Sequence, residues 1–338
     1  MSAHLDWKKL GFEYIKTRAH VRASWEDGKW GKLKIFKKDY ISMSIAATCL
    51  HYGQACFEGL KAFSTKDGKV KIFRPDENLK RMNNTADFLH IPRIPEELFF
   101  EALLKVIREN LDYIPPYGTG GSLYIRPLLI GSGPTIGVAP SGRYEFIVLV
   151  IPVGKYYEDG LKGVKAIILD DFDRAAPKGT GHVKVAGNYA ASLHPSIIAK
   201  KMGFPIVLYL DSKTHEYIDE FGTSNFVAID KRGYYVTPDS RTILPSITNK
   251  SLSTLAEDLG IKVQRRPIHI TELSDFVEVG ACGTAVVITP IESITHNEKI
   301  WTFPSSTNAV LKKLYDHLIG IQYGEKEDKF GWLFDTGI

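Results

Sequence analysis

The sequence predicts an α/β fold of the α+β kind with two domains. Short apolar runs typical of strands alternate with stretches whose apolar residues recur at helical spacing, without repeats or low-complexity segments. A chain of 338 residues with 44% hydrophobic content is too long for one small core, which favours two domains. Residues 152–160 separate two apolar runs. We therefore expect an N-terminal domain at 1–151, a connection at 152–160 and a C-terminal domain at 161–338.

The N-terminal part is predicted to be rich in strands. They are expected at residues 32–35, 56–63, 70–73, 122–130 and 144–151. Pro75 marks the start of a helix, and the apolar residues at helical spacing behind it are Leu79, Met82, Ala86 and Leu89. A second helix is expected over 96–110, and its buried stripe consists of Leu98, Phe99, Leu103 and Ile107. The prolines at 115–116 and the glycine-rich turn at 118–121 end this segment.

The C-terminal part alternates strands with helices. Strands are expected at residues 164–169, 206–210 and 226–229, and a turn of small residues at 280–285. A helix over 189–202 should stop at Gly203, and one over 248–259 should be capped by Thr248 and ended by Gly260. The last helix is expected over about 308–319, closed by Gly320.

Composition and motifs argue against several classes of function. The formal charge of +4 is small and spread along the chain, which does not indicate nucleic acid binding. We find no apolar run of 18 residues and no signal-peptide pattern, so we expect a cytoplasmic protein without a membrane partner. Three cysteines without a CxxC pair argue against disulfides and structural zinc. Fingerprints for dinucleotides, P-loops, nucleophile elbows and HExxH metal sites are missing from the sequence.

Lys184 is the most informative single residue. It has a valine on either side, and Gly181 and Gly187 allow close backbone approach, so its amine can lie in a partly dry pocket. Desolvation favours the neutral, nucleophilic amine, which forms a Schiff base with aldehydes such as pyridoxal phosphate. The alternative is a strand-edge lysine whose amine reaches solvent.

Other residues could serve a phosphorylated aldehyde. Thr248 stands at a helix start, where free N–H groups attract anions, although it could be a plain cap. The turn at 280–285, with Thr284, could bind the same phosphate or a carboxylate, or be an ordinary tight turn. Arg81 could clamp a phosphate or be a solvated surface charge. Glu220 lies where an apolar strand resumes, so a buried carboxylate could face a protonated pyridine nitrogen.

The order of these segments resembles a known family. The stretches are 52–63 (YGQACFEGLKAF), Phe73-Arg74-Pro75 with Arg81, 122–131 (SLYIRPLLIG), and the segments around Lys184, Glu220, Leu244-Pro245 and Gly283-Thr284. From about Trp30 to Trp332 the chain resembles the branched-chain aminotransferases, class IV aminotransferases that are pyridoxal-phosphate enzymes of fold type IV. The resemblance implies a smaller N-terminal α/β domain, a larger C-terminal pseudo-barrel domain and a site between them.

The resemblance also implies roles for residues. Lys184 would form the Schiff base, Glu220 would partner the pyridine nitrogen and Tyr189 would donate to the phenolic oxygen. The phosphate would be held by residues of four segments, namely Arg81, Thr223, Ile247, Thr248 and Thr284. The α-carboxylate of the substrate would meet Tyr124 and the amides of Thr284 and Ala285, and the distal carboxylate of glutamate would meet Arg126 and Tyr52. The side-chain pocket would be walled by Phe57, Tyr52 and Tyr156.

The family implies a homodimer and a reaction. A loop from the neighbouring subunit would bring Ile136 and Val138, and the amino group of leucine, isoleucine or valine would pass to 2-oxoglutarate by ping-pong kinetics. Val286 and Thr289 stand where some members carry a CxxC pair, so thiol regulation is not expected. The alternatives are a D-amino-acid aminotransferase, an aminodeoxychorismate-lyase-like enzyme and a non-catalytic protein that binds pyridoxal phosphate.

Overall fold

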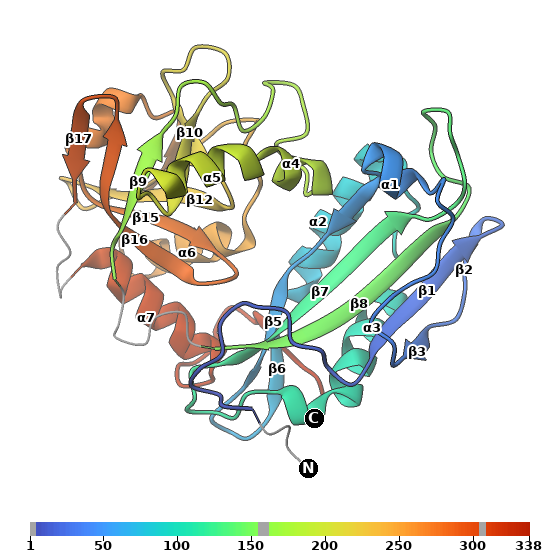
Figure 1. Cartoon of the computed structure of the whole chain (residues 1–338). Helices are drawn as coiled ribbons and strands as arrows, with labels where there is room; N and C mark the ends of the chain where they lie inside the picture. Colours follow the sequence, from blue (N-terminus) through green and yellow to red (C-terminus); the bar gives the residue numbers. More distant parts are fainter. Residues whose placement is uncertain (1–4, 155–161, 304–308) are drawn as a thin grey trace. The chain divides into compact units, whose positions relative to one another are not determined.

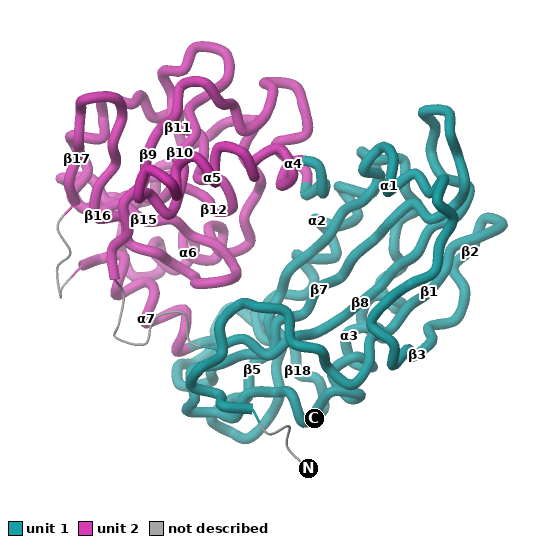
Figure 2. Tube along the Cα trace, viewed as in Figure 1, with its two compact units in different colours: residues 1–156, 184–187, 321–338 teal, residues 157–183, 188–320 magenta. Residues whose placement is uncertain are grey.

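The computed structural model describes residues 5–154, 162–303 and 309–338 (Figure 1). Its contacts divide the chain into two compact units, shown in Figure 2. Unit 1 consists of Met1–Tyr156, Lys184–Gly187 and Ile321–Ile338, and unit 2 consists of Tyr157–Val183 and Asn188–Gly320. Lys184 and the C-terminal tail thus cluster with unit 1, although the predicted C-terminal domain includes them. The domain limits given by the sequence stay a prediction, because most of 152–160 lies outside the described residues.

The strands of unit 1 form one antiparallel sheet of nine strands. Their order is β18-β6-β5-β7-β8-β1-β2, with β3 beside β1 and β4 beside β7. The strands are β1 (His20–Glu26), β2 (Lys29–Trp30), β3 (Lys34–Phe36), β4 (Ala55–Phe57), β5 (Leu60–Ser64), β6 (Val70–Phe73), β7 (Ser122–Gly131), β8 (Tyr144–Val153) and β18 (Leu333–Asp335). The single strand predicted at 56–63 is wrong, because Glu58 and Gly59 separate β4 from β5. The strand predicted at 70–73 has the expected ends, and the other strands predicted in this unit are present with shifted ends.

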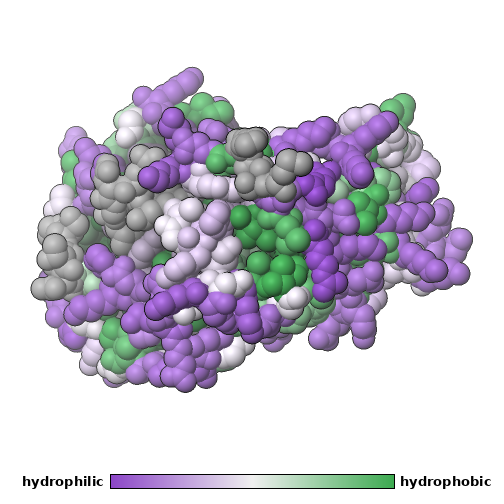
Figure 3. Space-filling model, turned by 90° about the horizontal axis from the view of Figure 1, so that it is seen from below, coloured by the Kyte–Doolittle hydropathy of each residue, from purple (hydrophilic) through white to green (hydrophobic). Residues whose placement is uncertain are grey.

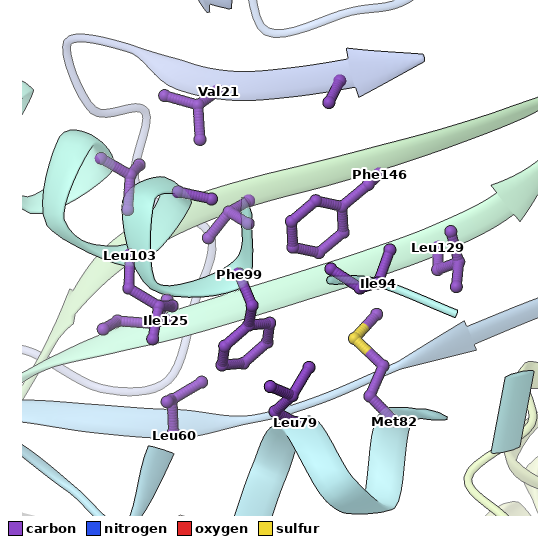
Figure 4. Packing of buried hydrophobic residues seen from close by; sticks show 14 of the residues in the cluster. Val21, Leu60, Leu79, Met82, Ile94, Phe99, Leu103, Ile125, Leu129 and Phe146 are labelled. Atoms are coloured by element: carbon purple, nitrogen blue, oxygen red, sulfur yellow. The ribbon is translucent and has the colours of Figure 1, made fainter. Parts of the chain in front are cut away.

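Helices pack on one face of this sheet and form its core. They are α2 (Pro75–Phe88) and α3 (Glu96–Glu109), accompanied by the 3-10 turn η1 (Leu111–Tyr113), whereas the short α1 (Thr48–Tyr52) packs its Cys49 in a separate cluster with Ala55, Ile130 and Ile147. Figure 4 shows Leu79 and Met82 of α2 and Phe99 of α3 among side chains of the strands, and Phe99 stacks on Phe146 with centroids 6.2 Å apart. Each fully buried side chain of this size contributes about 1.5–3 kcal/mol. The predicted stripe of α3 is confirmed, except that Leu98 is only partly buried.

The strands of unit 2 form a second nine-stranded sheet that closes on itself. Its order is β11-β10-β9-β16-β15-β12-β13-β14, β17 pairs with β16, and β11 also pairs with β12, so six strands complete a ring. The strands are β9 (Val164–Ile168), β10 (Ile206–Leu210), β11 (Ile218–Phe221), β12 (Ser224–Asp230), β13 (Tyr235–Pro238), β14 (Val263–Arg266), β15 (Phe276–Gly283), β16 (Val287–His296) and β17 (Lys299–Thr302). The apolar side chains inside this unit include Phe221, Phe226 and Ile294. The ring is the predicted pseudo-barrel.

Helices of unit 2 differ from the prediction at several ends. They are α4 (Ala186–Ala191), α5 (Leu193–Lys201), α6 (Ile247–Asp258), α7 (Val310–Gln322) and the 3-10 segment η2 (Ile270–Asp275), where α4 begins and α7 ends within unit 1 residues. The single helix predicted over 189–202 is wrong, because a turn at Ser192 separates α4 from α5. Ser246, not Thr248, caps α6, since its side chain accepts the amide of Asn249. The last helix continues past Gly320 instead of closing there.

The predicted turn at 280–285 is shorter than expected. Gly280 to Gly283 complete β15, and the turn begins at Thr284. A Cβ at Gly280 would lie 2.9 Å from the Ile288 side chain and 3.1 Å from that of Leu311, so the small residue allows close packing inside the unit. The glycine therefore serves the sheet and not a turn.

Hydrophilic residues predominate on the face shown in Figure 3, and hydrophobic residues gather there in separate patches. None of the helices in the described part of the chain has the length and apolar character needed to cross a bilayer. The same residues include no group of three His, Cys, Asp or Glu side chains placed to hold a metal ion.

Candidate active site

The backbone of Lys184 is fixed against β4 and α2 within unit 1. Val185 forms an antiparallel bridge with Cys56, the amide of Phe57 donates to the Lys184 carbonyl at 3.4 Å, and the Lys184 amide donates to Thr85 Oγ1 at 3.1 Å. The Nζ atom lies 4.6 Å from the centroid of the Phe57 ring. The amine therefore lies over an aromatic surface, and the Lys184 side chain is half buried.

Arg81 of α2 is held by a buried carboxylate. Its Nε and Nη2 atoms donate to Oε1 and Oε2 of Glu58, both at 2.7 Å, and the Glu58 side chain has no exposed surface. Asn78 also donates to Oε2, at 2.7 Å. Arg81 is thus an ordered, mostly buried guanidinium and not a solvated surface charge.

Arg126 and Tyr124 stand side by side on β7. Arg126 Nη2 donates to the Tyr124 hydroxyl at 2.9 Å, and its guanidinium carbon lies 4.6 Å from the centroid of the Phe57 ring. A Cβ at Gly59 would collide with the hydroxyl of Tyr124 and lie 2.9 Å from its Cζ, so glycine is needed for this close approach. Burial raises the pKa of Tyr124, while the Arg126 charge opposes that rise. The hydroxyl therefore stays a neutral donor at physiological pH.

The structure describes three of the four residues predicted at the intersubunit loop and the aromatic wall, other than Phe57. Tyr52, at the end of α1, donates to the carbonyl of Ile136 in the same chain. The side chains of Ile136 and Val138 are 69% and 88% exposed, so the described part of this chain leaves them largely uncovered. Tyr156 lies outside the described residues.

Glu220 is the buried acid of unit 2. It lies on β11, and its Oε1 accepts from Arg174 Nη1 at 2.9 Å and from the Leu244 amide at 2.8 Å, while Oε2 accepts from Asn225 Nδ2 at 2.7 Å. Burial raises the pKa of Glu220 to about 7, and the Arg174 charge and these hydrogen bonds limit that rise. A second positive group beside Glu220 would favour its ionised form further.

Two segments of unit 2 are of kinds that bind anions in proteins, namely a helix start and a turn of small residues. Ile247 and Thr248 are the first two residues of α6, both buried, and helix starts present free N–H groups and a positive dipole end. Thr284 and Ala285 form the turn after β15, and the carbonyl of Thr223 lies 3.9 Å from where a Cβ on the adjacent Gly283 would stand. Tyr189 lies on α4 and is half buried.

Several polar residues of the site were not predicted. Glu58 is a carboxylate in an apolar run, which is the same local signal that points to Glu220. Asn225 pairs with Glu220 across the hairpin of β11 and β12, so that hairpin would have pointed to it, whereas Arg174 lies far from Glu220 in sequence and has no local signal. Asn78 looked like an ordinary residue of a helix.

Comparisons with known proteins agree on one family. A model of the amino-transferase class IV family matches residues 55–294. The branched-chain-amino-acid aminotransferase of Helicobacter pylori is 48% identical over 336 residues, 99% of this chain and 98% of that protein. The corresponding protein of Haemophilus influenzae is 48% identical over 337 residues, 97% of this chain and 98% of that protein.

A solved structure gives the same result. The Escherichia coli branched-chain amino acid aminotransferase has a TM-score of 0.78 at 28% identity and covers 94% of this chain and 99% of its own. The predicted fold type IV architecture is confirmed.

Class IV aminotransferases use pyridoxal phosphate, and the residues of this chain fit that cofactor. The set comprises a lysine amine over an apolar ring, an ordered guanidinium, a helix start and a buried carboxylate with a pKa near neutrality. Such a group requires an amine, donors for its phosphate and an acid, and these residues are of those kinds. The chain belongs to the class IV aminotransferases.

Proposed function

We propose that this protein transfers the amino group of L-leucine, L-isoleucine or L-valine to 2-oxoglutarate. The observation that carries the substrate assignment is the Phe57 ring, which has the amine of Lys184 and the guanidinium of Arg126 each 4.6 Å from its centroid. An aromatic wall beside a cation suits both an apolar side chain and the distal carboxylate of glutamate. The relatives from Helicobacter pylori and Haemophilus influenzae, named for this activity, support the proposal.

Pyridoxal phosphate, when bound, supplies the aldehyde that receives the amino group and the conjugated ring that takes up electrons released at Cα. Lys184 would act as the base that removes the proton from Cα of the amino acid and delivers it to the carbon on the far side of the transferred nitrogen. Glu220 holds a negative charge for the ring nitrogen, and Arg174 helps to keep that carboxylate ionised. Tyr189 donates to the phenolic oxygen. The phosphate is held by Arg81, Thr223, Ile247, Thr248 and Thr284.

Substrate binding follows from opposite demands on one pocket. An apolar wall of Phe57 and Tyr52 favours a branched side chain by about 0.8 kcal/mol per buried methylene. Arg126 and Tyr52 pair with the distal carboxylate of glutamate, whose burial needs a cation. The α-carboxylate is bound by Tyr124 and by the amides of Thr284 and Ala285. A short polar substrate would leave a buried group unpaired, at a cost of about 1–3 kcal/mol.

A homodimer is part of the proposal. Ile136 and Val138 are exposed apolar side chains next to glycine in the segment 131–143, as expected if they reach a neighbouring subunit. Closed symmetric dimers are the commonest way in which identical chains bury such surface. We place the protein in the cytoplasm, with small molecules as its other partners.

The test compares Lys184→Ala with Lys178→Ala, an exposed lysine nearby. Purified Lys178→Ala should bind pyridoxal phosphate with a yellow absorbance band and should turn over L-leucine and 2-oxoglutarate. Lys184→Ala should fold, as judged by circular dichroism, yet lack the band and most turnover. Full activity in Lys184→Ala would refute the assignment, and a band that answers only to D-alanine would redirect the substrate to D-amino acids.

A further inference from the structure

Glu58 is a buried carboxylate that the proposed reaction does not use. It follows Phe57 at the end of β4, and its side chain is fully buried. Its two oxygens accept from Arg81 Nε and Nη2 at 2.7 Å, and Oε2 also accepts from Asn78 Nδ2 at 2.7 Å and from the Gly59 amide at 3.2 Å. The backbone amide of Glu58 donates to the Pro127 carbonyl at 2.8 Å. Hydrogen bonds therefore hold both the carboxylate group and the backbone of Glu58 in place.

The group is charged in spite of its burial. Burial alone would raise the pKa of Glu58, but the charges of Arg81 and Lys184 and the hydrogen bonds from Arg81 and Asn78 outweigh it, so the pKa lies below its ordinary value. Buried ion pairs add little net stability compared with an apolar pair, because desolvation offsets their attraction. A role in fixing geometry explains better why an acid stands there.

We propose that Glu58 is a positioning residue that orients Arg81 for the phosphate of the cofactor. The inference rests on the proposed function, in which Arg81 is a phosphate ligand. Two parallel hydrogen bonds to one edge of a guanidinium define both its plane and its rotation within that plane. A guanidinium carries five N–H donors in a rigid fork, so it can serve acceptors on two of its edges. Arg81 is thus ordered before the phosphate arrives, which removes part of the entropy cost of binding.

Glu58 could also have the opposite effect and weaken phosphate binding. Glu58 and a phosphate are both anions, so the carboxylate could compete for Arg81 and weaken the binding of the phosphate. The two roles predict changes of opposite sign when the Glu58 charge is removed.

The experiment titrates the full-length, cofactor-free protein with pyridoxal phosphate and with pyridoxal, and follows their absorbance. The two ligands share the aldehyde and differ in the phosphate, so any effect of Glu58 on Lys184 cancels in the ratio of their dissociation constants. Glu58→Gln should lower the preference for pyridoxal phosphate at least tenfold and leave pyridoxal binding unchanged. The exposed Glu101→Gln is the control and should keep the wild-type ratio. An unchanged or increased preference in Glu58→Gln overturns the inference.

Two variants separate this inference from the proposed function. Arg81→Lys keeps the charge but loses the fork, so it should also lower the preference, and adding Glu58→Gln to it should change nothing more. If Arg81→Lys keeps the wild-type ratio, the phosphate role of Arg81 in the proposed function fails. If Arg81→Lys lowers the ratio and Glu58→Gln does not, only the inference fails. Should Glu58→Gln not fold, Asn78→Ala removes a donor to the same carboxylate and should lower the ratio at least threefold, while an unchanged ratio refutes the role.

Discussion

Arg174 Nη1 lies 2.9 Å from Oε1 of Glu220, and both side chains are almost completely buried. The same nitrogen donates to the carbonyls of Gly181 and Thr242 at 3.3 and 3.0 Å, so the backbone fixes Arg174 independently of the acid. The Glu220 carboxylate is thereby oriented by three donors, from Arg174, Leu244 and Asn225. The carboxylate that we propose to meet the ring nitrogen is therefore held in place before any ligand binds.

Burial of Glu220 should make the cofactor-free protein less stable as the pH rises. Its pKa is raised from 4.5 to about 7, so between these values the folded state binds a proton that the unfolded chain has released. This contribution is fully present below pH 4.5 and lost as the pH rises through about 7, and it amounts to roughly 3 kcal/mol. Urea unfolding at about pH 5 and about pH 8 should show a free energy advantage of wild type over Glu220→Gln that shrinks by about this amount. An advantage that grows with pH would contradict the buried acid.

Removal of the Arg174 charge should shift the pH dependence of activity. Arg174 lowers the pKa of Glu220, so Arg174→Gln should raise that pKa further. The acidic limb of the kcat/KM profile should then move to higher pH by about one unit. Arg174→Lys keeps a positive charge and serves as the control, with a profile close to wild type. A profile that is the same in both variants would show that Arg174 has only a structural role.

Arg126→Gln should separate the two half-reactions. The variant loses the cation for the distal carboxylate of glutamate but keeps the apolar wall of Phe57. A hydrogen bond to a charged group is worth about 1.5–3 kcal/mol, so the half-reaction with 2-oxoglutarate should slow about 10–100-fold. The half-reaction with L-leucine should change much less. Equal losses in both, measured by stopped-flow absorbance, would argue against this role for Arg126.

Gly59→Ala should displace the ring of Tyr124. The added Cβ has no room beside the hydroxyl and Cζ of that tyrosine. Because Tyr124 is proposed to bind the α-carboxylate, KM should rise for both the amino acid and the oxo acid, and kcat/KM should fall about tenfold or more. Gly142→Ala is the control, since nothing among the described residues lies within 4 Å of its added Cβ and its backbone is not left-handed. An unchanged KM in Gly59→Ala would show that the ring can shift without consequence.

Local patterns predicted those parts of the protein that depend on neighbours in sequence. Pro75 and the apolar spacing behind it located α2. Long-range pairing could not be read in this way. β11 and β12 form a local hairpin, but the ring closes only because β9 pairs with β16 and β12 pairs with β15, strands that lie far apart in the sequence.

The errors have the same origin. Ser246 caps α6 in place of Thr248 because the chain turns two residues earlier. Gly280 has the sequence pattern of a turn but lies in strand β15. The side chains of Ile288 and Leu311 leave no space there for a Cβ atom. No local sequence pattern distinguishes Arg174, because its contact with Glu220 joins residues that lie far apart in the sequence.

The most direct test of the central claim mixes the purified, cofactor-loaded protein with L-leucine and then with 2-oxoglutarate, and records the absorbance spectrum after each addition. We predict a yellow band that bleaches with L-leucine, ignores D-leucine and returns with 2-oxoglutarate, because one site must accept both an apolar and a charged side chain. A band that L-leucine leaves unchanged, or that bleaches and is not restored by 2-oxoglutarate, would contradict the proposed reaction.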